Sequence, residues 1–181
     1  HMALDTPVTP IRSALLVEGR SDRTALLGLA DRLGRDLAAE GVDVVAMGGA
    51  HAIGEHLSRL ARRDVRVAGL CDEGEEVVFR TALESAGLGR DLDREGMAAL
   101  GFHVCVEDLE DELIRANGQT AVLDVLTRSG DLSAFRTMQR QPAWRGASFD
   151  RQMRRWIAAG ATRKTRYARL LVEALDLTDV P

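Results

Sequence analysis

The stretch SALLVEGRSD, residues 13–22, decides the fold. Residues 13–17 form a short, largely apolar run, and Glu18, Gly19 and Asp22 follow at the point where that run ends. A continuously apolar run that passes through a glycine into a helical pattern is typical of a buried parallel strand followed by a helix. The stretch therefore predicts a βα unit with two carboxylates at the carboxyl end of its strand.

The same alternation continues along the chain and predicts an α/β fold. Strands are expected over 13–17, 42–47, 65–71 and 101–106, and helices over about 22–34, 50–62 and 74–86. Ser21 or Asp22 is expected to cap the first helix. Beyond the fourth strand the apolar spacing is helical throughout. We expect a parallel sheet of about four strands flanked by helices, with a C-terminal helical extension.

Three segments are expected. Residues 1–12 include a His1-Met2 tag scar and a flexible lead-in, residues 13–117 form the α/β core, and residues 118–181 form a basic helical extension packed on that core. At 181 residues with 45% apolar content, the chain is long enough to bury a core. No apolar run approaches the roughly 18 residues of a membrane span, and the N-terminus has no signal-peptide pattern. Cys71 and Cys105 fall in predicted strands, so we expect buried free thiols and a cytoplasmic, reducing location.

Charge is distributed unevenly along the chain. Residues 128–169 contain ten arginines and one lysine against two aspartates, a balance of +9, which leaves −13 for the remainder of a chain whose total is −4. Five of the seven aromatic residues lie in the same segment. We expect this segment to contact a nucleic-acid backbone, with Arg154, Arg155, Arg163 and Arg166 as the binding residues. Trp144 and Trp156 are more simply interpreted as residues that pack the extension on the sheet.

Acidic residues follow three of the predicted strands. The three groups are Glu18 with Asp22, Asp72 with Glu75 and Glu76, and Asp108 with Glu110. Each group also has a plainer explanation, as a helix cap, as first-turn acids that complement the helix dipole, or as a solvated face. Since the carboxyl ends of parallel strands share one edge of a sheet, three such groups together favour a shared site. Oxygen-only ligands suit Mg²⁺ or Mn²⁺.

These residues resemble the Toprim domain, which topoisomerases, bacterial primases and the overcoming-lysogenization-defect (OLD) nucleases share. The resemblance rests on Val17-Glu18-Gly19-x-x-Asp22, on the strand-end Asp72, and on the later Asp-Leu-Glu-Asp run. The OLD type is the more similar, through residues 108–114 and 163–168, and the resemblance spans roughly residues 13–172. It implies that Glu18 binds metal or acts as general acid or base, and that Asp22, Asp72 and Glu110 hold metal.

Two departures from the family pattern stand out. Many Toprim domains carry a second aspartate two residues after the first, where this chain has Gly74, so Glu75 or Glu76 substitutes or one metal position is weakened. OLD nucleases also carry an ATPase half, but no phosphate-binding-loop motif occurs here, so any ATPase would be a separate chain. Lys164, the sole lysine, is expected to act as a catalytic residue at the scissile phosphate, although a chance surface position is an open alternative.

The sequence therefore predicts an enzyme, a Mg²⁺- or Mn²⁺-dependent nuclease that cleaves phosphodiesters in nucleic acid. DNA is the favoured substrate, although the sequence leaves RNA, the cleavage pattern, the number of metals and the oligomeric state open. Two alternatives remain. One is a catalytically weak Toprim scaffold that binds nucleic acid or a partner ATPase. The other is a receiver-like domain phosphorylated on Asp72, against which Gly19 and the long basic extension argue.

Overall fold

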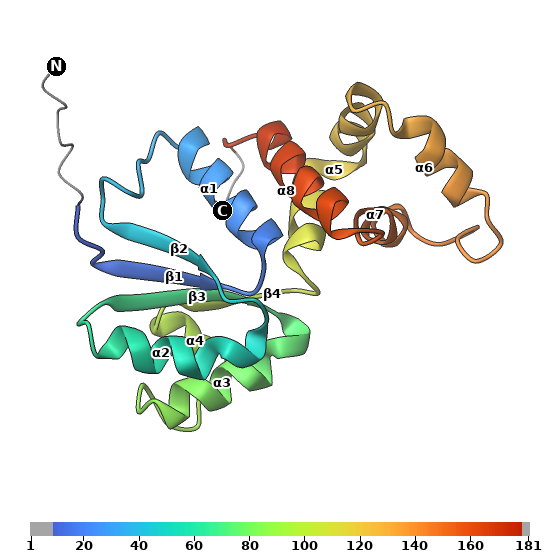
Figure 1. Cartoon of the computed structure of the whole chain (residues 1–181). Helices are drawn as coiled ribbons and strands as arrows, with labels where there is room; N and C mark the ends of the chain where they lie inside the picture. Colours follow the sequence, from blue (N-terminus) through green and yellow to red (C-terminus); the bar gives the residue numbers. More distant parts are fainter. Residues whose placement is uncertain (1–8, 179–181) are drawn as a thin grey trace, which may run out of the picture.

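The computed structural model describes residues 9–178, and its centre is a single four-stranded parallel sheet (Figure 1). The strands are β1 (Ser13–Val17), β2 (Val42–Ala46), β3 (Arg66–Asp72) and β4 (Phe102–Cys105), in the order β2-β1-β3-β4. Each strand was predicted to within one residue at either end, and the α/β class is confirmed. Of the predicted lead-in, residues 1–8 lie outside the described residues.

The register of the sheet brings the strand ends to one edge. β1 is central and pairs with both β2 and β3, with Val17 opposite Ala46 and Leu16 opposite Gly69. A side chain at Gly69 would place its Cβ 2.6 Å from the ring of Phe102 on β4, so this position in β3 needs a glycine. With β1 and β3 paired in parallel, the residues that follow Val17 and Asp72 emerge on the same side of the molecule.

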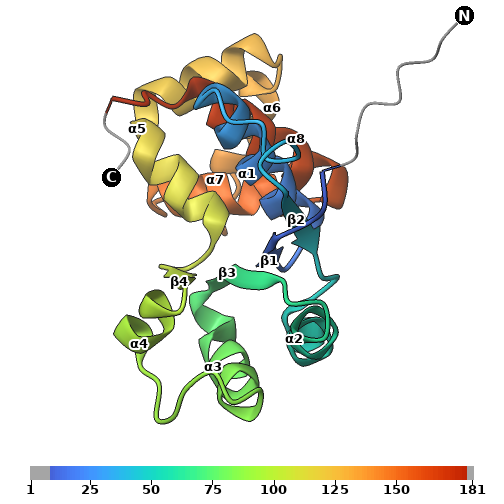
Figure 2. The ribbon, with the colours of Figure 1, turned by 90° about the vertical axis from the view of Figure 1, so that its left-hand side faces the viewer.

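Three helices cover one face of the sheet (Figures 1 and 2). They are α2 (Ile53–Ala61), α3 (Glu76–Ser85) and α4 (Arg94–Ala99), with short 3₁₀ turns at Ala50–Ala52 and Glu73–Glu75 before the first two. The helix α4 was not predicted, because it has only six residues and buries only Met97. The core on this face includes Leu16, Ile53, Leu57, Cys71, Phe79, Leu83 and Phe102.

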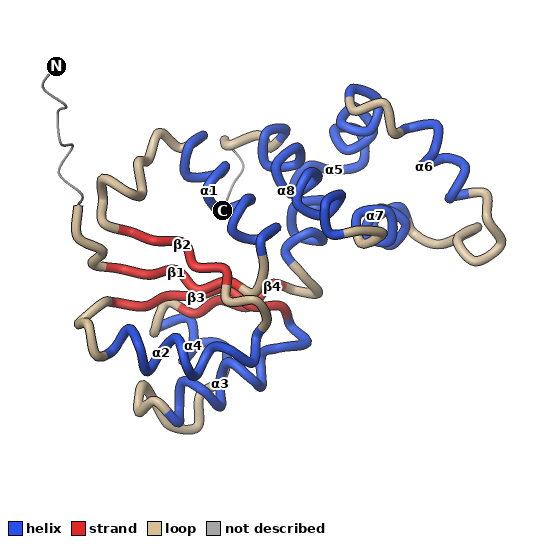
Figure 3. Tube along the Cα trace, viewed as in Figure 1, coloured by secondary structure: helices blue, strands red, loops and turns tan. Residues whose placement is uncertain are grey.

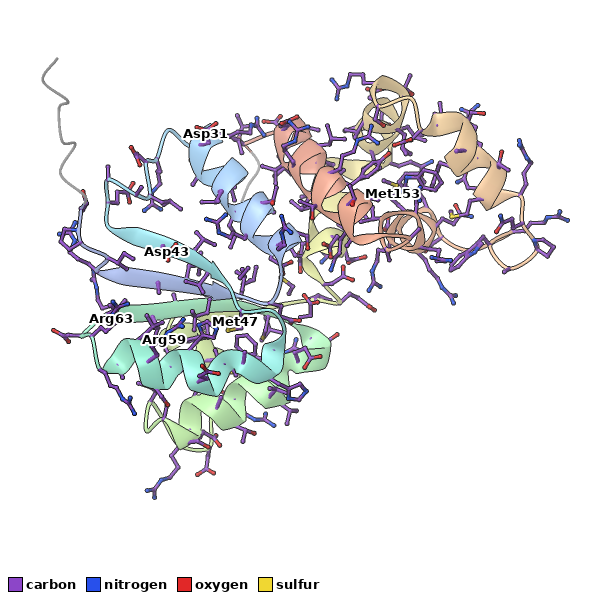
Figure 4. All side chains as sticks on the ribbon, viewed as in Figure 1. Asp31, Asp43, Met47, Arg59, Arg63 and Met153 are labelled. Atoms are coloured by element: carbon purple, nitrogen blue, oxygen red, sulfur yellow. The ribbon has the colours of Figure 1, made fainter. Side chains whose placement is uncertain are left out.

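The opposite face is covered by a helical layer that also extends beyond the sheet (Figures 1 and 3). Its members are α1 (Arg20–Arg32), α5 (Leu109–Arg128), α6 (Leu132–Gln139), α7 (Phe149–Ile157) and α8 (Ala161–Ala174), with α8 beside α1. α5 is kinked at Gly118, whose φ of 72° and ψ of 162° are not helical. The helical layer has a core of its own, to which Met153 belongs, whereas Met47 belongs to the core between the sheet and α2 and α3; both methionines are labelled in Figure 4.

Two predictions about buried residues have different outcomes. Cys71 and Cys105 are buried and free, as predicted, and burial raises the pKa of the Cys71 thiol to about 12. Trp156 is buried, but it packs against Phe135 inside the helical layer and not on the sheet, while Trp144 is only half-buried. None of the helices between residues 9 and 178 is both long and apolar enough to cross a membrane.

Candidate functional site

The ends of the two central strands are joined through the side chain of Glu18. Glu18 directly follows β1, and Asp72 is the last residue of β3. The backbone N–H of Asp72 donates a hydrogen bond of 3.2 Å to Glu18 Oε1. This contact links residues 54 positions apart and fixes the Glu18 carboxylate beside Asp72. The sheet thus builds the first acidic pair without help from the helices.

Asp22 points back toward the same strand end. Helix α1 begins at Arg20 with Gly19 as its N-cap, so the prediction that Ser21 or Asp22 caps it is wrong. Asp22 lies in the first turn, where its Oδ2 accepts a 2.7 Å hydrogen bond from the N–H of Gly19, and it is only 9% exposed. The strand-turn-helix geometry therefore buries this carboxylate close to Glu18.

The turn from β4 to α5 supplies the remaining acids. Asp108 is the N-cap of α5 and accepts a 2.8 Å hydrogen bond from the N–H of Asp111, so one of its oxygens caps the helix, a role that the sequence analysis did not assign to it. Glu110, one residue into the helix, is 3% exposed. Its Oε1 is buried without a hydrogen-bond partner among the described residues. We refer to Glu18, Asp22, Asp72 and Glu110 as the acidic edge.

Lys164 reaches the acidic edge from α8. Its Nζ lies 3.2 Å from Glu110 Oε2, and the lysine side chain remains 39% exposed. Burial acts to lower the pKa of Lys164, but Glu110, Asp22 and Asp72 raise it, and the net shift is upward. The ammonium therefore stays charged, and the sole lysine of the chain lies beside residues that were predicted to bind metal.

A cleft of about 540 Å³ opens at this point. It is lined by acids of the edge, by Lys164 and Arg20, and by Gly48 and Gly49. The two glycines have φ values of 83° and 130° and donate hydrogen bonds of 2.9 and 3.0 Å to the carbonyl of Glu18. Only glycine adopts such backbone conformations readily. The Gly-Gly pair after β2 is the sequence signal from which this wall of the cleft could have been found.

Burial and mutual repulsion raise the pKa values along the acidic edge. The pKa of Asp72 rises to about 7, first through burial and then through the charges of Glu18, Asp22, Asp108 and Glu110. Burial is also the main cause of raised pKa values at Glu18, Asp22 and Glu110, with the Asp72 and Gly19 N–H groups opposing it at the first two. Negative charge at this edge exceeds what Lys164 alone compensates.

Glu75 and Glu76, which were also predicted as metal ligands, differ from each other in their contacts. Glu76 forms a 2.6 Å salt bridge with Arg94 of α4 and a longer contact of 4.0 Å with Arg80. Glu75 is close enough to raise the pKa of Glu18. Of the two residues that could replace an acid at Gly74, Glu75 is therefore the better placed.

The arginines predicted to bind nucleic acid are largely engaged within the protein. Arg154 bonds Asp108 Oδ2 at 2.7 Å and Glu107 at 2.8 Å. Arg163 stacks 4.0 Å above the Trp156 ring, and Arg166 pairs with Asp131 at 2.9 Å. Arg155 lies 5.9 Å from the centre of the Trp144 ring.

The chemistry of the acidic edge suits a hard divalent cation. Its donors are all carboxylate oxygens, the charge is under-compensated, and Glu110 Oε1 is a buried acceptor that lacks a donor. Between residues 9 and 178, however, no three His, Cys, Asp or Glu side chains are already gathered as a metal-binding group. The residues fit the cation in type and location, and side-chain movement would have to complete the coordination.

Acidic groups at the carboxyl edge of a parallel sheet, close to a lysine from a following helical layer, are the arrangement that a resemblance to the Toprim domain implies. Residues 11–73 match the family model described as "Overcoming lysogenization defect protein-like, TOPRIM domain". The OLD-like Toprim resemblance is thereby confirmed for the segment that contains Glu18, Asp22 and Asp72.

Solved structures extend the likeness to most of the chain. The C-terminal region of the Xanthomonas campestris pv. campestris OLD protein is similar with a TM-score of 0.65 and 23% identity, covering 94% of this chain and 86% of that one. The C-terminal region of the Burkholderia pseudomallei OLD protein is similar with a TM-score of 0.68 and 18% identity, covering 94% and 92%. At these identities the likeness establishes the fold. Comparison with curated protein sequences gave no significant match.

Proposed function

We propose that this chain is a Mg²⁺- or Mn²⁺-dependent nuclease that hydrolyses phosphodiester bonds in nucleic acid, with DNA the preferred substrate. The observation that carries the proposal is the acidic edge itself, where four carboxylates, one directly after β1 and one each from α1, β3 and α5, lie close to one lysine from α8. The match of residues 11–73 to an OLD-like Toprim model supports the same activity class. The buried free cysteines are consistent with a reducing, cytoplasmic location.

Each residue of the site has a proposed role. Asp22, Asp72 and Glu110 would hold the divalent cation, with Glu75 and Asp108 as further acids nearby and Glu76 held by Arg94. When bound, the cation supplies Lewis-acid stabilisation of the charge on the phosphate. Glu18, whose pKa is raised mainly by burial, is suited to accept a proton at its carboxylate. Lys164 Nζ is placed to stabilise charge on the scissile phosphate.

The hydrolysis follows from these positions. Water attacks the phosphorus as the bond to the departing ester oxygen breaks, and the proton of the water passes to Glu18. The departing oxygen takes a proton from solvent, since the raised pKa of Lys164 makes its ammonium a poor acid. Charge on the phosphate is greatest during this step, which is when the fixed ammonium contributes most.

The test is metal-dependent cleavage of plasmid DNA by the purified chain. We expect nicking or linearisation with Mn²⁺ or Mg²⁺, none with EDTA, and a loss of at least about 10²–10³-fold in Asp72→Ala. Arg63→Ala, an exposed change in the turn between α2 and β3, at the end of the sheet away from the acidic edge, is the control and should retain full activity. Activity that survives EDTA, or that is equal in Asp72→Ala, would contradict the proposal.

A second candidate, a weakly active scaffold that binds nucleic acid or a partner ATPase, is favoured by one observation. Gly74 occupies the position of the second family aspartate, and no three ligands are yet gathered among the described residues. Gly74 is exposed, and an added Cβ would meet nothing within 4 Å. Gly74→Asp should therefore fold normally. If it converts an inactive chain into a Mn²⁺-dependent nuclease, the scaffold interpretation holds for the natural sequence.

A further inference from the structure

A second cavity, larger than the acidic cleft, lies between α1 and α8. It has a volume of about 640 Å³. Its polar walls are formed by Arg20 and Thr24 from α1 and by Lys164, Thr165, Arg166 and Arg169 from α8. We call it the α1–α8 groove. No carboxylate and no aromatic ring lines it within the described residues, in contrast to the acidic cleft beside it.

The groove and the acidic cleft are contiguous. Gly19, Arg20 and Lys164 line both, so the first turn of α1 and the single lysine lie at their junction. A phosphodiester held at the acidic edge faces carboxylates on one side, which repel it. The groove offers the neighbouring phosphates of the same strand cations and hydroxyl donors within a short distance.

The cations of the groove differ in how far the protein already uses them. Among residues 9–178 Arg20 forms no salt bridge, and its residue is exposed. Arg169 pairs with Glu173 one helical turn away at 3.2 Å, but both side chains are more than half exposed, at 59% and 52%. Such an exposed pair contributes little to stability, and a phosphate can replace it. Arg20 and Arg169 are therefore the groove cations most available to a ligand.

We propose that the α1–α8 groove binds the sugar-phosphate backbone of a single nucleic-acid strand next to the bond that is cleaved. The inference rests on the proposed function for the identity of the ligand. The volume is that of a small-ligand site, roughly 300–1,000 Å³, which suits a short length of one strand and not a duplex. Because no aromatic ring offers a stacking surface, recognition is through phosphates and depends little on base sequence.

This assignment keeps the α8 end of the basic segment 128–169 in the nucleic-acid path but changes which cations are most available. Arg154 and Arg163 are held by Asp108 and by Trp156, so they are less free to contact phosphate. Arg166 lines the groove while also pairing with Asp131. Arg20, which lies outside the basic segment 128–169, becomes a binding residue in addition to Arg169.

The test is fluorescence anisotropy with a labelled single-stranded DNA oligonucleotide in EDTA, where no metal-dependent cleavage occurs. The double variant Arg20→Gln/Arg169→Gln should bind about tenfold more weakly at low salt, and its log-log salt slope should fall by about 1.4, for two lost phosphate contacts at about 0.7 each. Arg59→Gln/Arg63→Gln removes the same charge on the α2 side of the sheet and should bind like wild type (Figure 4).

Several outcomes would overturn the inference. They are an unchanged affinity and salt slope in the groove variant, an equal loss in the α2 control, or binding of duplex but not of single strand. The result is independent of the nuclease test. If the wild-type chain cleaves DNA and the groove variant binds the oligonucleotide with normal affinity, only the proposal that the groove binds the strand is refuted. A chain that binds through the groove but never cleaves refutes only the proposed function.

Discussion

The acidic edge and the basic helical layer use their charges in opposite ways. At the edge, four carboxylates from separate elements lie close to Lys164, and their pKa values are raised first by burial and then by mutual repulsion. In the layer, Arg154, Arg163 and Arg166 already have partners in Asp108, Trp156 and Asp131. The negative charge of the acidic edge is therefore concentrated at one place in the folded protein, whereas three of the four arginines predicted to bind nucleic acid already contact other residues of the chain. Segment charge in a sequence is therefore a poor measure of charge available to a ligand.

The largest expected effect is on Lys164, the one residue that joins the two regions. Lys164→Ala should lower the single-turnover cleavage rate by roughly 10–10³-fold, because it removes a fixed charge beside the scissile phosphate. Lys164→Arg should recover only part of that rate, since the guanidinium is larger and its donors are planar. Thermal unfolding of the same proteins should show that both remain folded. Unchanged rates in Lys164→Ala would return this residue to the ordinary surface.

The second expected effect is on the pH dependence of cation binding at the acidic edge. Cation binding requires the ionised carboxylate of Asp72, whose pKa is raised to about 7. Mn²⁺ affinity measured by calorimetry should therefore rise by up to about tenfold per pH unit below pH 7 and level off above it. If affinity is flat between pH 5.5 and 8, Asp72 is not a ligand that titrates in this range.

The third effect tests the basic side. Arg154→Ala should lower the free energy of unfolding in urea by about 1–2 kcal/mol, because it leaves the partly buried Asp108 without its two-nitrogen partner. Arg151→Ala is the matched control on the same helix, since Arg151 is exposed and only approaches the Trp144 ring at 6.0 Å. Equal stability of the two variants would show that the arginines of this layer are as free as the sequence suggested.

The parts of the fold that the sequence predicted well depend on local patterns. Short apolar runs located all four strands, and the acids after three of them located Glu18, Asp72 and Asp108 at one sheet edge. Lys164 was found because the chain has no other lysine. Each of these signals is carried by residue type and position along the chain, so tertiary packing did not need to be known.

The parts that were missed depend on which residues meet across the fold. That Arg154 pairs with Asp108, 46 residues away, or that Arg20 and Arg169 share a groove, follows from the packing of α7 and α8 against other elements. The role of Gly48 and Gly49 depends on packing in the same way, since the pair forms a wall of the cleft only because its N–H groups reach the carbonyl of Glu18. Sequence spacing alone contains none of these distances.

The smallest expected effect is on the stability of the metal-free chain, and it has an unusual sign. The pKa of Asp72 is raised in the folded state, so the protonated carboxyl stabilises the fold at low pH, and this contribution is lost as pH rises through about 7. Above that pH the ionised Asp72 is repelled by the charges of Glu18, Asp22 and Glu110, and the substitution Asp72→Asn removes this repulsion. Because Asp72 is only about half-buried, solvent screening reduces the gain in the free energy of unfolding to about 1 kcal/mol.

The Asp72→Asn variant should thus unfold at a higher temperature than wild type in EDTA at pH 8, with the difference disappearing near pH 4. Saturating Mn²⁺ should reverse the order at pH 8, since only the wild-type acidic edge would then be stabilised by the cation. A variant that is less stable than wild type at pH 8 in EDTA would mean that Asp72 is a structural residue and that the acidic edge is not held under electrostatic strain.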